Sequence, residues 1–403
     1  MLCEDYTTNL LDMEHMEIKT CEKSCDEIVL HVQMKRRGEY CPKCGGYTEA
    51  VHDYREQTVK DCPVQGKALI WKYRKRRYRC QCCGKRFYEK NWLLPKWHRI
   101  TNRLALMAIQ KLSEKVSRKD IAKGLGVSES TICRWMNLTE YGKPGKLPAV
   151  LSIDEFRGNA GGEKFQGILT SPLEKKIFDI LPSCKEREIY EYLHGFSKEE
   201  REKVRYFISD MKKDYLRIAK LLFPNATPVI DKFHVVRYCT WALENVRKRV
   251  QKELLPEDRK YFKRSRTLLL KHMRDLKDEG KLAVERMLMV NTDLNDAYLL
   301  KEKFYEFMDS KSRDEARKKL KEFRMYAYAA DLPEFDALLR VLQNWQEYIL
   351  NAFDCHYSNG FTEGCNNKIK VLKRIAFGYR NFGNLRQRIM LTVNAPKPTP
   401  CRA

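Results

Sequence analysis

Four cysteines in two closely spaced pairs could hold a metal ion. Two residues separate Cys41 from Cys44 in CPKCGG, and the same spacing separates Cys80 from Cys83 in CQCCGK. A Cys-x-x-Cys turn directs two thiolates toward one ion, and the glycine that follows each pair lets the backbone turn tightly. Four thiolates form the tetrahedral set that zinc prefers and leave no open position, so we predict a structural Zn²⁺ site. The alternative is accidental spacing in a chain with 15 cysteines.

Three acidic residues far apart in the chain could hold a different kind of metal site. Asp154 and Asp210 each end an apolar run, and Glu363 stands at the expected start of a helix. Carboxylates suit hard cations, and two Mg²⁺ or Mn²⁺ ions about 3.5–4 Å apart can support phosphodiester cleavage. Singly, an Asp at a strand end is often a turn residue, and a Glu at a helix start often only compensates the helix dipole. The catalytic hypothesis therefore needs a fold that brings all three together.

The order of elements after residue 148 predicts such a fold. Three strand-like segments come first, then a helix over 186–203 and a strand that ends at Asp210. A short helix and a fifth strand with Asp231 and His234 follow. This is the order of a ribonuclease H-like mixed α/β fold, in which the first and fourth strands are neighbours, so Asp154 and Asp210 should lie side by side.

The third acid is expected from a later helix that begins near Glu363. Helical spacing puts several polar and basic residues on the same side as this carboxylate. One face could thus contact both metal and DNA phosphate, through Lys370 and Arg374.

Two N-terminal segments are typical of DNA binding. In residues 71–79, WKYRKRRYR, strand alternation puts Trp71 and Tyr73 on one face and a row of cations on the other. Such cations suit phosphate contact, although the solvated face of a zinc ribbon would have the same pattern. The predicted contacts are Lys72, Arg74, Arg76 and Arg77.

Residues 117–136 predict a helix-turn-helix. Ser117 and Ser128 can cap two short helices, and GLGV between these helices makes the turn. An ordinary helical hairpin is the alternative. If the second helix enters the major groove, the residues that reach DNA are Glu129, Ser130, Thr131 and Arg134.

Composition agrees with a nucleic-acid partner. The 403 residues carry a formal charge of +24, and the hydrophobic fraction of 43% is enough for packed cores. No apolar run approaches the roughly 20 residues of a membrane helix, and the acidic N-terminus does not resemble a signal peptide. We therefore expect a multidomain cytoplasmic, nucleoid-associated bacterial protein without a membrane partner. The expected parts are a zinc module (1–90), a helix-turn-helix domain (91–146), a ribonuclease H-like core (147–236 and 351–395) and an all-helical insertion (237–350).

Taken together, these segments resemble bacterial insertion-sequence transposases of the acid-triad (DDE) class, ISL-three type. The similar stretches include CPKCGG, YRCQCCGKRF, SIDEF, FPNATPVIDKFHVVR and TEGCNNKIKVLKRIAFGYRNF, in the order of the family. The resemblance implies Asp154 as first acid and Glu363 as third. We choose Asp210 as second acid because it ends the predicted fourth strand. Asp231 and His234 look like the Asp-x-x-His signature that follows the second acid in related transposases, and Asp231 is the alternative second acid.

The sequence therefore predicts a DNA transposase that binds double-stranded terminal inverted repeats and target DNA. Two-metal cleavage would free a 3′-hydroxyl, which attacks the target, and work at two element ends suggests a dimer or larger assembly. The rivals are a non-catalytic DNA-binding regulator derived from a transposase and a different metal-dependent nuclease on the same fold. DNA binding without metal-dependent cutting would favour the regulator.

Overall fold

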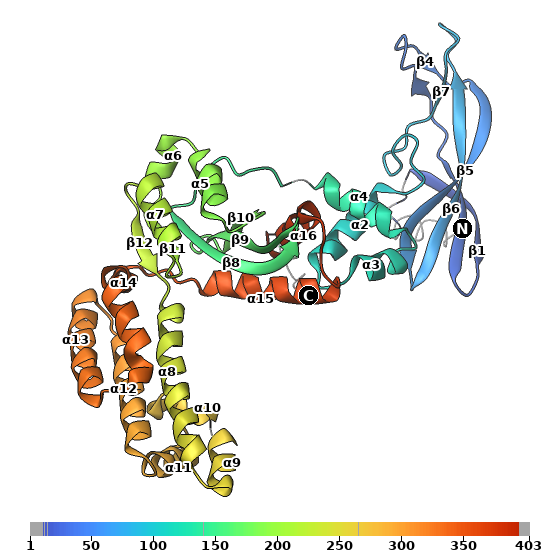
Figure 1. The fold of residues 1–403 in the computed structure, drawn as a ribbon. Coiled ribbons are helices and arrows are strands. Elements are labelled where there is room, and N and C mark those ends of the chain that lie inside the picture. The colour runs from blue at the N-terminus through green and yellow to red at the C-terminus, as the bar shows by residue number, and fades with distance from the viewer. Residues whose placement is uncertain (1–10, 12, 14, 140, 265, 395–403) are drawn as a thin grey trace. The chain divides into compact units, whose positions relative to one another are not determined.

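The chain divides into two compact units, which are described separately. The computed structural model describes residues 11, 13, 15–139, 141–264 and 266–394 (Figure 1). The first unit comprises residues up to Tyr141 together with residues from Val371 onward, and the second comprises Gly142–Lys370. Of the predicted zinc module (1–90), residues 1–10, 12 and 14 lie outside the described residues.

The first unit begins with a five-stranded sheet. Its path is β1 (Met16–Lys23), β2 (Glu27–Met34), β6 (Lys67–Arg79) and β5 (Val51–Val64), and β7 (Arg86–Tyr88) also pairs with β6. Strands β5 and β6 form a long hairpin whose two-residue turn, Gln65 and Gly66, has φ of 52° and 76°. Positive φ at both positions matches the right-handed twist of the strands that flank such a turn. The short strands β3 (Glu39–Tyr40) and β4 (Tyr47–Thr48) form a separate pair.

The basic strand β6 changes its buried face halfway along. Trp71 and Tyr73 are buried as predicted, and they pack in a core with residues of β2. Beyond Arg74 the even-numbered positions become buried instead, because β6 leaves β2 after Tyr73 and pairs with β7 from Arg77 onward. A simple alternation over nine residues could not foresee this change.

Helices complete the first unit. α2 (Asn102–Ser113), α3 (Arg118–Gly124) and α4 (Glu129–Leu138) share one apolar core, to which Leu391 of α16 (Phe382–Asn394) also belongs. The buried Arg388 of α16 donates hydrogen bonds to the carbonyl oxygens of Glu114 and Val116. α16 lies within residues 351–395, which the sequence predicts as the final part of the catalytic core, and in the structure it packs against α2 and α4.

The second unit contains a mixed five-stranded sheet of order β10-β9-β8-β11-β12. β8 (Val150–Ala160), β9 (Glu163–Ser171) and β10 (Lys176–Leu181) form an antiparallel meander. β11 (Tyr206–Ser209) lies parallel between β8 and β12 (Thr227–Ile230). The first and fourth strands of this region are therefore neighbours, as the predicted strand order requires.

Helices cover the sheet and continue beyond it. α5 (Glu186–His194) and α7 (Lys213–Leu222) pack on the face that carries Leu151 and Ile153, and the short α6 (Lys198–Glu202) lies between them in the chain. α15 (Gly360–Ile375) begins in this unit. The remaining helices pack around a separate apolar core: α8 (Lys232–Glu253), α9 (Pro256–Arg264), α10 (Arg266–Leu269), α11 (Asp278–Leu288), α12 (Thr292–Met308), α13 (Arg313–Ala330) and α14 (Asp336–Asp354).

The architecture is thus a mixed α/β protein with a predominantly helical segment between β12 and α15. Among the helices of the described residues, none is both long and apolar enough to cross a membrane.

Candidate active site, zinc site and DNA-binding surfaces

The two cysteine pairs meet in the first unit. The Sγ atoms of Cys41, Cys44, Cys80 and Cys83 all lie within 4.8 Å of one another. The Sγ–Sγ distance is 3.6 Å between Cys41 and Cys83 and 3.5 Å between Cys44 and Cys80. A tetrahedron with Zn–S bonds of 2.3 Å has edges of about 3.8 Å, so these sulfur atoms are placed as a zinc ion requires.

The local backbone explains this placement. After each cysteine pair a glycine adopts a positive φ, 73° at Gly45 and 67° at Gly84, and its amide donates to the carbonyl oxygen of the first cysteine. The backbone amide of Cys83 lowers the pKa of the Cys80 thiol to about 6, and the thiolate is the form that binds zinc. The exposed Cys82 is not part of the four-sulfur cluster.

The predicted cations of β6 lie in different environments. Arg74 is exposed, and its guanidinium lies 4.1 Å from the ring centroid of Tyr54. Lys72 and Arg77 are half-buried, and Arg77 pairs with Asp53 at 3.3 Å. The predicted DNA contact of Arg76 differs from the structure. Arg76 is 3% exposed and forms an ion pair with the buried Glu89 at 3.2 Å, so its guanidinium faces the protein interior and not a ligand.

The helix-turn-helix follows the predicted capping. The Oγ atoms of Ser117 and Ser128 accept hydrogen bonds from backbone amides in the first turns of α3 and α4. The other three candidates on α4 are exposed, but Thr131 is 8% exposed and its hydroxyl is hydrogen-bonded to that of Ser128. The predicted DNA contact of Thr131 therefore also differs from the structure, because its hydrogen bond to the capping Ser128 holds the side chain inward. The exposed candidates are Glu129, Ser130 and Arg134.

In the second unit, one cleft collects all the predicted acids. It has a volume of about 450 Å³. Asp154 comes from β8, Asp210 directly follows β11, and Glu363 lies in the first turn of α15. Asp231 directly follows β12, and His234 lies in the first turn of α8. All five of these residues line the cleft, together with Glu155, Phe233, Arg237, Asn359, Asn366 and Lys370.

Strand alternation and a polar network fix Asp154 toward α15. Leu151 and Ile153 face α5 and α7, so Ser152 and Asp154 belong to the other face of β8. There the hydroxyl of Ser152 donates to Oδ1 of Asn359, and Asn366 Nδ2 donates to Oδ2 of Asp154 at 2.8 Å. Buried hydroxyls of Thr170 and Thr362 join the same network, 2.7 Å apart. These contacts set the start of α15, and with it Glu363, against the sheet.

Asp210 has one buried side-chain oxygen, Oδ1, that has no hydrogen-bond partner among the described residues. Burial raises the pKa of Asp210 to about 6, the nearby Asp154 adds to the rise, and Lys212 and His234 oppose it. Burial also raises the pKa of Asp154. Such a carboxylate is costly when it is charged and unpaired, so a bound cation would relieve it.

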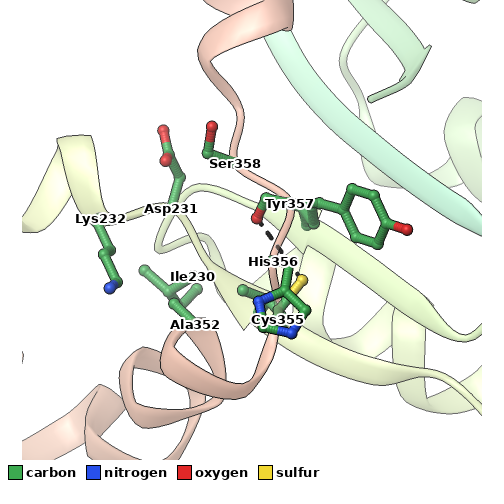
Figure 2. A pocket seen from close by; sticks show the side chains of 10 residues that line it. Ile230, Asp231, Lys232, Ala352, Cys355, His356, Tyr357 and Ser358 are labelled. Atoms are coloured by element: carbon green, nitrogen blue, oxygen red, sulfur yellow. Dashed lines mark hydrogen bonds between the residues drawn. The ribbon is translucent and has the colours of Figure 1, made fainter. Parts of the chain in front are cut away.

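Asp231 lines both the acidic cleft and a smaller cavity of about 150 Å³. In Figure 2 its carboxylate and the hydroxyl of Ser358 point to the same side, whereas Lys232 points away. Burial raises the pKa of Asp231, opposed by His234 and by the backbone amides of Phe233 and Asn359. Backbone amides thus already stabilise the Asp231 carboxylate, whereas Oδ1 of Asp210 has no hydrogen-bond partner among the described residues.

The charge balance of the cleft is unusual for so basic a chain. Five carboxylates line it, against two permanent cations, Arg237 and Lys370. Of these carboxylates, Glu155 forms an ion pair with Lys212. This negative charge would repel an anionic ligand, and a pair of divalent cations would neutralise it.

Sequence reasoning missed several lining residues. β11 pairs with β8 only as far as Ser152, so β8 runs on past its neighbour and Glu155 also reaches the cleft. The spacing of three residues from Asp231 to His234 to Arg237 on α8 could have identified Arg237. Phe233 and Asn359 left no signal in the sequence. Arg374 is exposed in the last turn of α15 and is not among the cleft residues.

Comparisons with known proteins find a match for the second unit, for the cysteine-containing segment and for the helix-turn-helix. Residues 151–389 match the family model of ISL3-type DDE proteins, described as a transposase. Residues 37–83 match a model described as the zinc-finger of transposase IS204/IS1001/IS1096/IS1165, and residues 97–147 match a homeodomain-like domain. The zinc-finger match and the four-sulfur cluster together support a structural zinc site.

Individual relatives are similar as well. The transposase for insertion sequence element IS1001 of Bordetella parapertussis is 23% identical over 349 residues, which cover 85% of each chain. The transposase for IS1557 of Mycobacterium tuberculosis is 29% identical over 199 residues, 44% of this chain and 45% of that protein. A Lactococcus lactis protein named ATP-dependent protease is 49% identical over 61 residues, 15% of this chain and 20% of its own.

Proposed function

The chain belongs to the ISL3 family of DDE transposases, and from this premise we propose that it cuts and joins DNA at the terminal inverted repeats of its insertion sequence. One observation carries the proposal: Asp154, Asp210 and Glu363, from three separate elements, line a single cleft. In a ribonuclease H-like fold the first and fourth strands meet at such a site. The parallel pairing of β8 with β11 supports that fold for the second unit.

The cleft residues fit two divalent cations. The donor set is made of carboxylate and amide oxygens, which suit Mg²⁺ or Mn²⁺, and buried Oδ1 of Asp210 lacks a partner among the described residues. Asp154, Asp210 and Glu363 would hold the ions. When bound, the ions supply a nucleophile at neutral pH and stabilise charge on the phosphate that is cut.

The protein's own side chains orient the reaction. Lys370 and Arg237 line the cleft and would bind phosphate oxygens beside the scissile bond. Asn366 holds the Asp154 carboxylate in one orientation. Water attacks phosphorus and the P–O3′ bond breaks, which leaves a 3′-hydroxyl and a 5′-phosphate. The 3′-hydroxyl then attacks a target phosphodiester, and a target 3′-oxygen leaves.

The first unit would recognise the element end. Its exposed DNA-contact candidates are Arg74 on β6 and three residues of α4: Glu129, Ser130 and Arg134. Lys72 and Arg77 on β6 are half-buried candidates. Because two ends must be cut and joined, we propose a dimer or larger assembly on DNA.

The test is strand cleavage of a duplex that carries the inverted repeat found beside the gene. With Mg²⁺, the full-length zinc-loaded protein should nick the element end and join its 3′-hydroxyl to a second duplex. Binding of this duplex without any metal-dependent cutting would instead indicate a regulator, and cutting without joining would indicate a different nuclease.

Replacing Asn366 tests how Asp154 is positioned. Asn366→Ala removes the 2.8 Å hydrogen bond to Asp154 Oδ2 and leaves that oxygen without its amide donor. Loss of such a bond to a charged group costs about 1.5–3 kcal/mol. We expect Mn²⁺ binding, measured by isothermal titration calorimetry, to weaken roughly 10- to 100-fold.

Asn366→Gln is not a safe substitute at a buried site, but Asn367→Ala is a matched control. Asn367 is the exposed neighbour on α15 and is not among the residues that line the cleft. Equal Mn²⁺ affinity of the Asn366→Ala and Asn367→Ala proteins would refute the positioning role.

The raised pKa of Asp210 predicts a pH-dependent stability. Unfolded Asp titrates near pH 4, whereas folded Asp210 titrates at about 6, so the folded state binds more protons between these values. Stability from this group is therefore present below about pH 4 and is lost as pH rises to 6. We expect Asp210→Asn to be more stable than wild type at pH 7.5 by roughly 1–3 kcal/mol.

The measurement is urea denaturation at pH 4.5, 6 and 7.5, without added Mg²⁺ and without a chelator, so that zinc is retained. The gain should shrink toward zero as pH falls. A gain that is the same at all three pH values would mean that the charge on Asp210 is not its cause.

A further inference from the structure

The turn between α15 and α16 exposes a phenylalanine whose backbone has a conformation that suits glycine. Phe377 is 100% exposed and has φ of 52°. Its amide donates to the carbonyl oxygen of Arg374, and the amide of Gly378 donates to that of Lys373. Gly is the most common residue at this position of such a helix end, because a Cβ atom is strained at positive φ. We call residues 374–380 the Phe377 turn.

Folding does not compensate this strain through the Phe377 side chain. A fully exposed ring buries no apolar surface against the rest of the protein, so it gains nothing from the hydrophobic effect when the chain folds. Strained backbone of this kind is concentrated at sites that bind or react, where a ligand can offset its cost. Both the exposure and the backbone of Phe377 therefore point to a ligand that covers the ring.

The segment that follows Phe377 is firmly attached to the first unit. Tyr379 is 6% exposed, and the guanidinium of Arg118 on α3 lies 5.7 Å from its ring centroid. The side chain of Asn381 then accepts a hydrogen bond of 2.9 Å from the amide of Asn384 at the start of α16. With α15 on one side and these contacts on the other, the turn presents Phe377 to solvent on a defined backbone.

The charges around the Phe377 turn suit a polyanion. Arg374 and Arg380 are exposed on either side of Phe377 in the chain. No Asp or Glu follows Glu363 in the sequence, whereas residues 364–394 include seven Lys or Arg. An apolar tip between two cations is thus combined with a strongly basic segment, which attracts phosphates.

The Phe377 turn also lies beside the helix that would enter the major groove. The guanidinium of Arg118, which contacts Tyr379, lies 3.5 Å from the carboxylate of Glu129 in the first turn of α4. Further along α4, the Sγ atom of Cys133 lies 3.9 Å from Oδ1 of Asn384. A duplex bound to α4 would therefore pass close to Phe377.

We propose that the Phe377 turn is a second contact with duplex DNA, in which Phe377 enters the minor groove and wedges between two base pairs of the element end. The inference rests on the proposed function. Apolar side chains that enter the minor groove partly unstack one base step and bend the duplex. Arg374 and Arg380 would bind the phosphates beside the groove, while the bases cover the exposed ring and offset the strain of its backbone.

Phe377→Gly should have two effects of opposite sign. Because Gly adopts positive φ without strain, the variant should unfold at a higher urea concentration than wild type, whereas a residue with a structural role would lose stability. Binding to the element end should weaken instead. Asp331→Gly is the control for release of strain, since Asp331 is an exposed residue with φ of 48° at the end of α13. This variant should also gain stability but bind DNA as wild type does.

DNA bending gives the specific readout. The probe is a duplex of about 30 base pairs that carries the inverted repeat found beside the gene, with a fluorescent donor and acceptor at its ends. The full-length zinc-loaded wild type should bend it by roughly 20–90°, and Phe377→Gly should bend it much less. Burial of a Phe side chain corresponds to a large factor in affinity, part of which unstacking offsets, so we expect about 10-fold weaker binding. Phe377→Leu should keep most of the bend, because Leu is also an effective wedge.

The outcomes separate this inference from the proposed function. Equal bending and equal affinity of Phe377→Gly and wild type would overturn the wedge, while cutting by wild type would leave the proposed function intact. A wild-type protein that bends the element end through Phe377 but never cuts it would refute the proposed function and support the wedge. Lower stability of Phe377→Gly would show that the ring has a partner within the folded protein, which also overturns the proposal.

A second copy of the chain and an anionic membrane are the other occupants that an apolar tip between cations could take. If Phe377→Gly leaves DNA bending unchanged but lowers the sedimenting mass of the protein, the Phe377 turn is a protein interface. If it leaves bending unchanged but abolishes binding to phosphatidylglycerol vesicles, the turn is a membrane contact. Either result would overturn the proposal.

Discussion

Asp154→Asn, Asp210→Asn and Glu363→Gln should each lower the rate of element-end cleavage by about 10³-fold or more. The amide keeps the size of each side chain but removes a negative oxygen ligand, and loss of one metal ligand raises the barrier by several kcal/mol. In the proposed function the other unit binds the terminal repeat, so the affinity for this DNA should change little. The two measurements are gel-resolved cleavage and fluorescence anisotropy of the same labelled duplex.

Glu155→Gln is the matched control for this prediction. Glu155 lies in the same cleft and in the same strand as Asp154, but it already forms an ion pair with Lys212. Its replacement should slow cleavage much less than replacement of any of the three acids. If the three acid variants cut as fast as Glu155→Gln, the proposed active site is incorrect.

The same series decides between Asp210 and Asp231 as second acid. Both line the cleft, so proximity alone does not separate them. Asp210 has a buried oxygen without a partner among the described residues, whereas burial raises the pKa of Asp231 and the backbone amides of Phe233 and Asn359 oppose that rise. We therefore expect Asp231→Asn to retain measurable cleavage where Asp210→Asn has none.

The order of the strand-like segments predicted that the strands with Asp154 and Asp210 are neighbours, and β8 does pair with β11. Asp154 lies inside β8 and not at its end, because β8 continues to Ala160, whereas Asp210 directly follows β11. Glu363 was expected at the start of a helix, and it lies in the first turn of α15. The cysteine pairs were readable for a similar reason, because a local turn determines where both sulfur atoms of a pair point. In both cases the information is local or follows from chain order.

Some features that the sequence did not predict depend on contacts between distant segments, and others depend on local geometry that the residue pattern does not show. Arg76 is buried because the partner of β6 changes from β2 to β7 along the strand. Thr131 is buried because its hydroxyl is hydrogen-bonded to Ser128, the N-cap of α4. The packing of α16 against α2 and α4 joins parts of the chain about 250 residues apart. Phe233 and Arg237 reach the cleft because α8 starts directly at the end of β12.

Loss of zinc should open one end of the first unit and leave the other end folded. Beside the four cysteines lie the two-residue strands β3 and β4, the short β7 and the end of β6, whereas Leu69, Trp71 and Tyr73 pack in a separate apolar core. Structural zinc contributes about 10–16 kcal/mol in small modules, as much as the whole stability of a typical domain. In Cys80→Ser we expect hydrogen-exchange protection to disappear at residues 39–48 and 80–88 but to persist at 69–73.

Cys82→Ser separates zinc binding from a general effect of losing a cysteine. Cys82 lies between two of the ligands in the chain but is exposed and outside the four-sulfur cluster, so this variant should retain one zinc per chain and full protection. Because the exposed Arg74 lies on the same hairpin, Cys80→Ser should also bind the terminal repeat more weakly than Cys82→Ser does. Retention of zinc by Cys80→Ser, or its loss from Cys82→Ser, would show that the ligands are assigned incorrectly, since a chelator-titrated zinc count reads the ligand set directly.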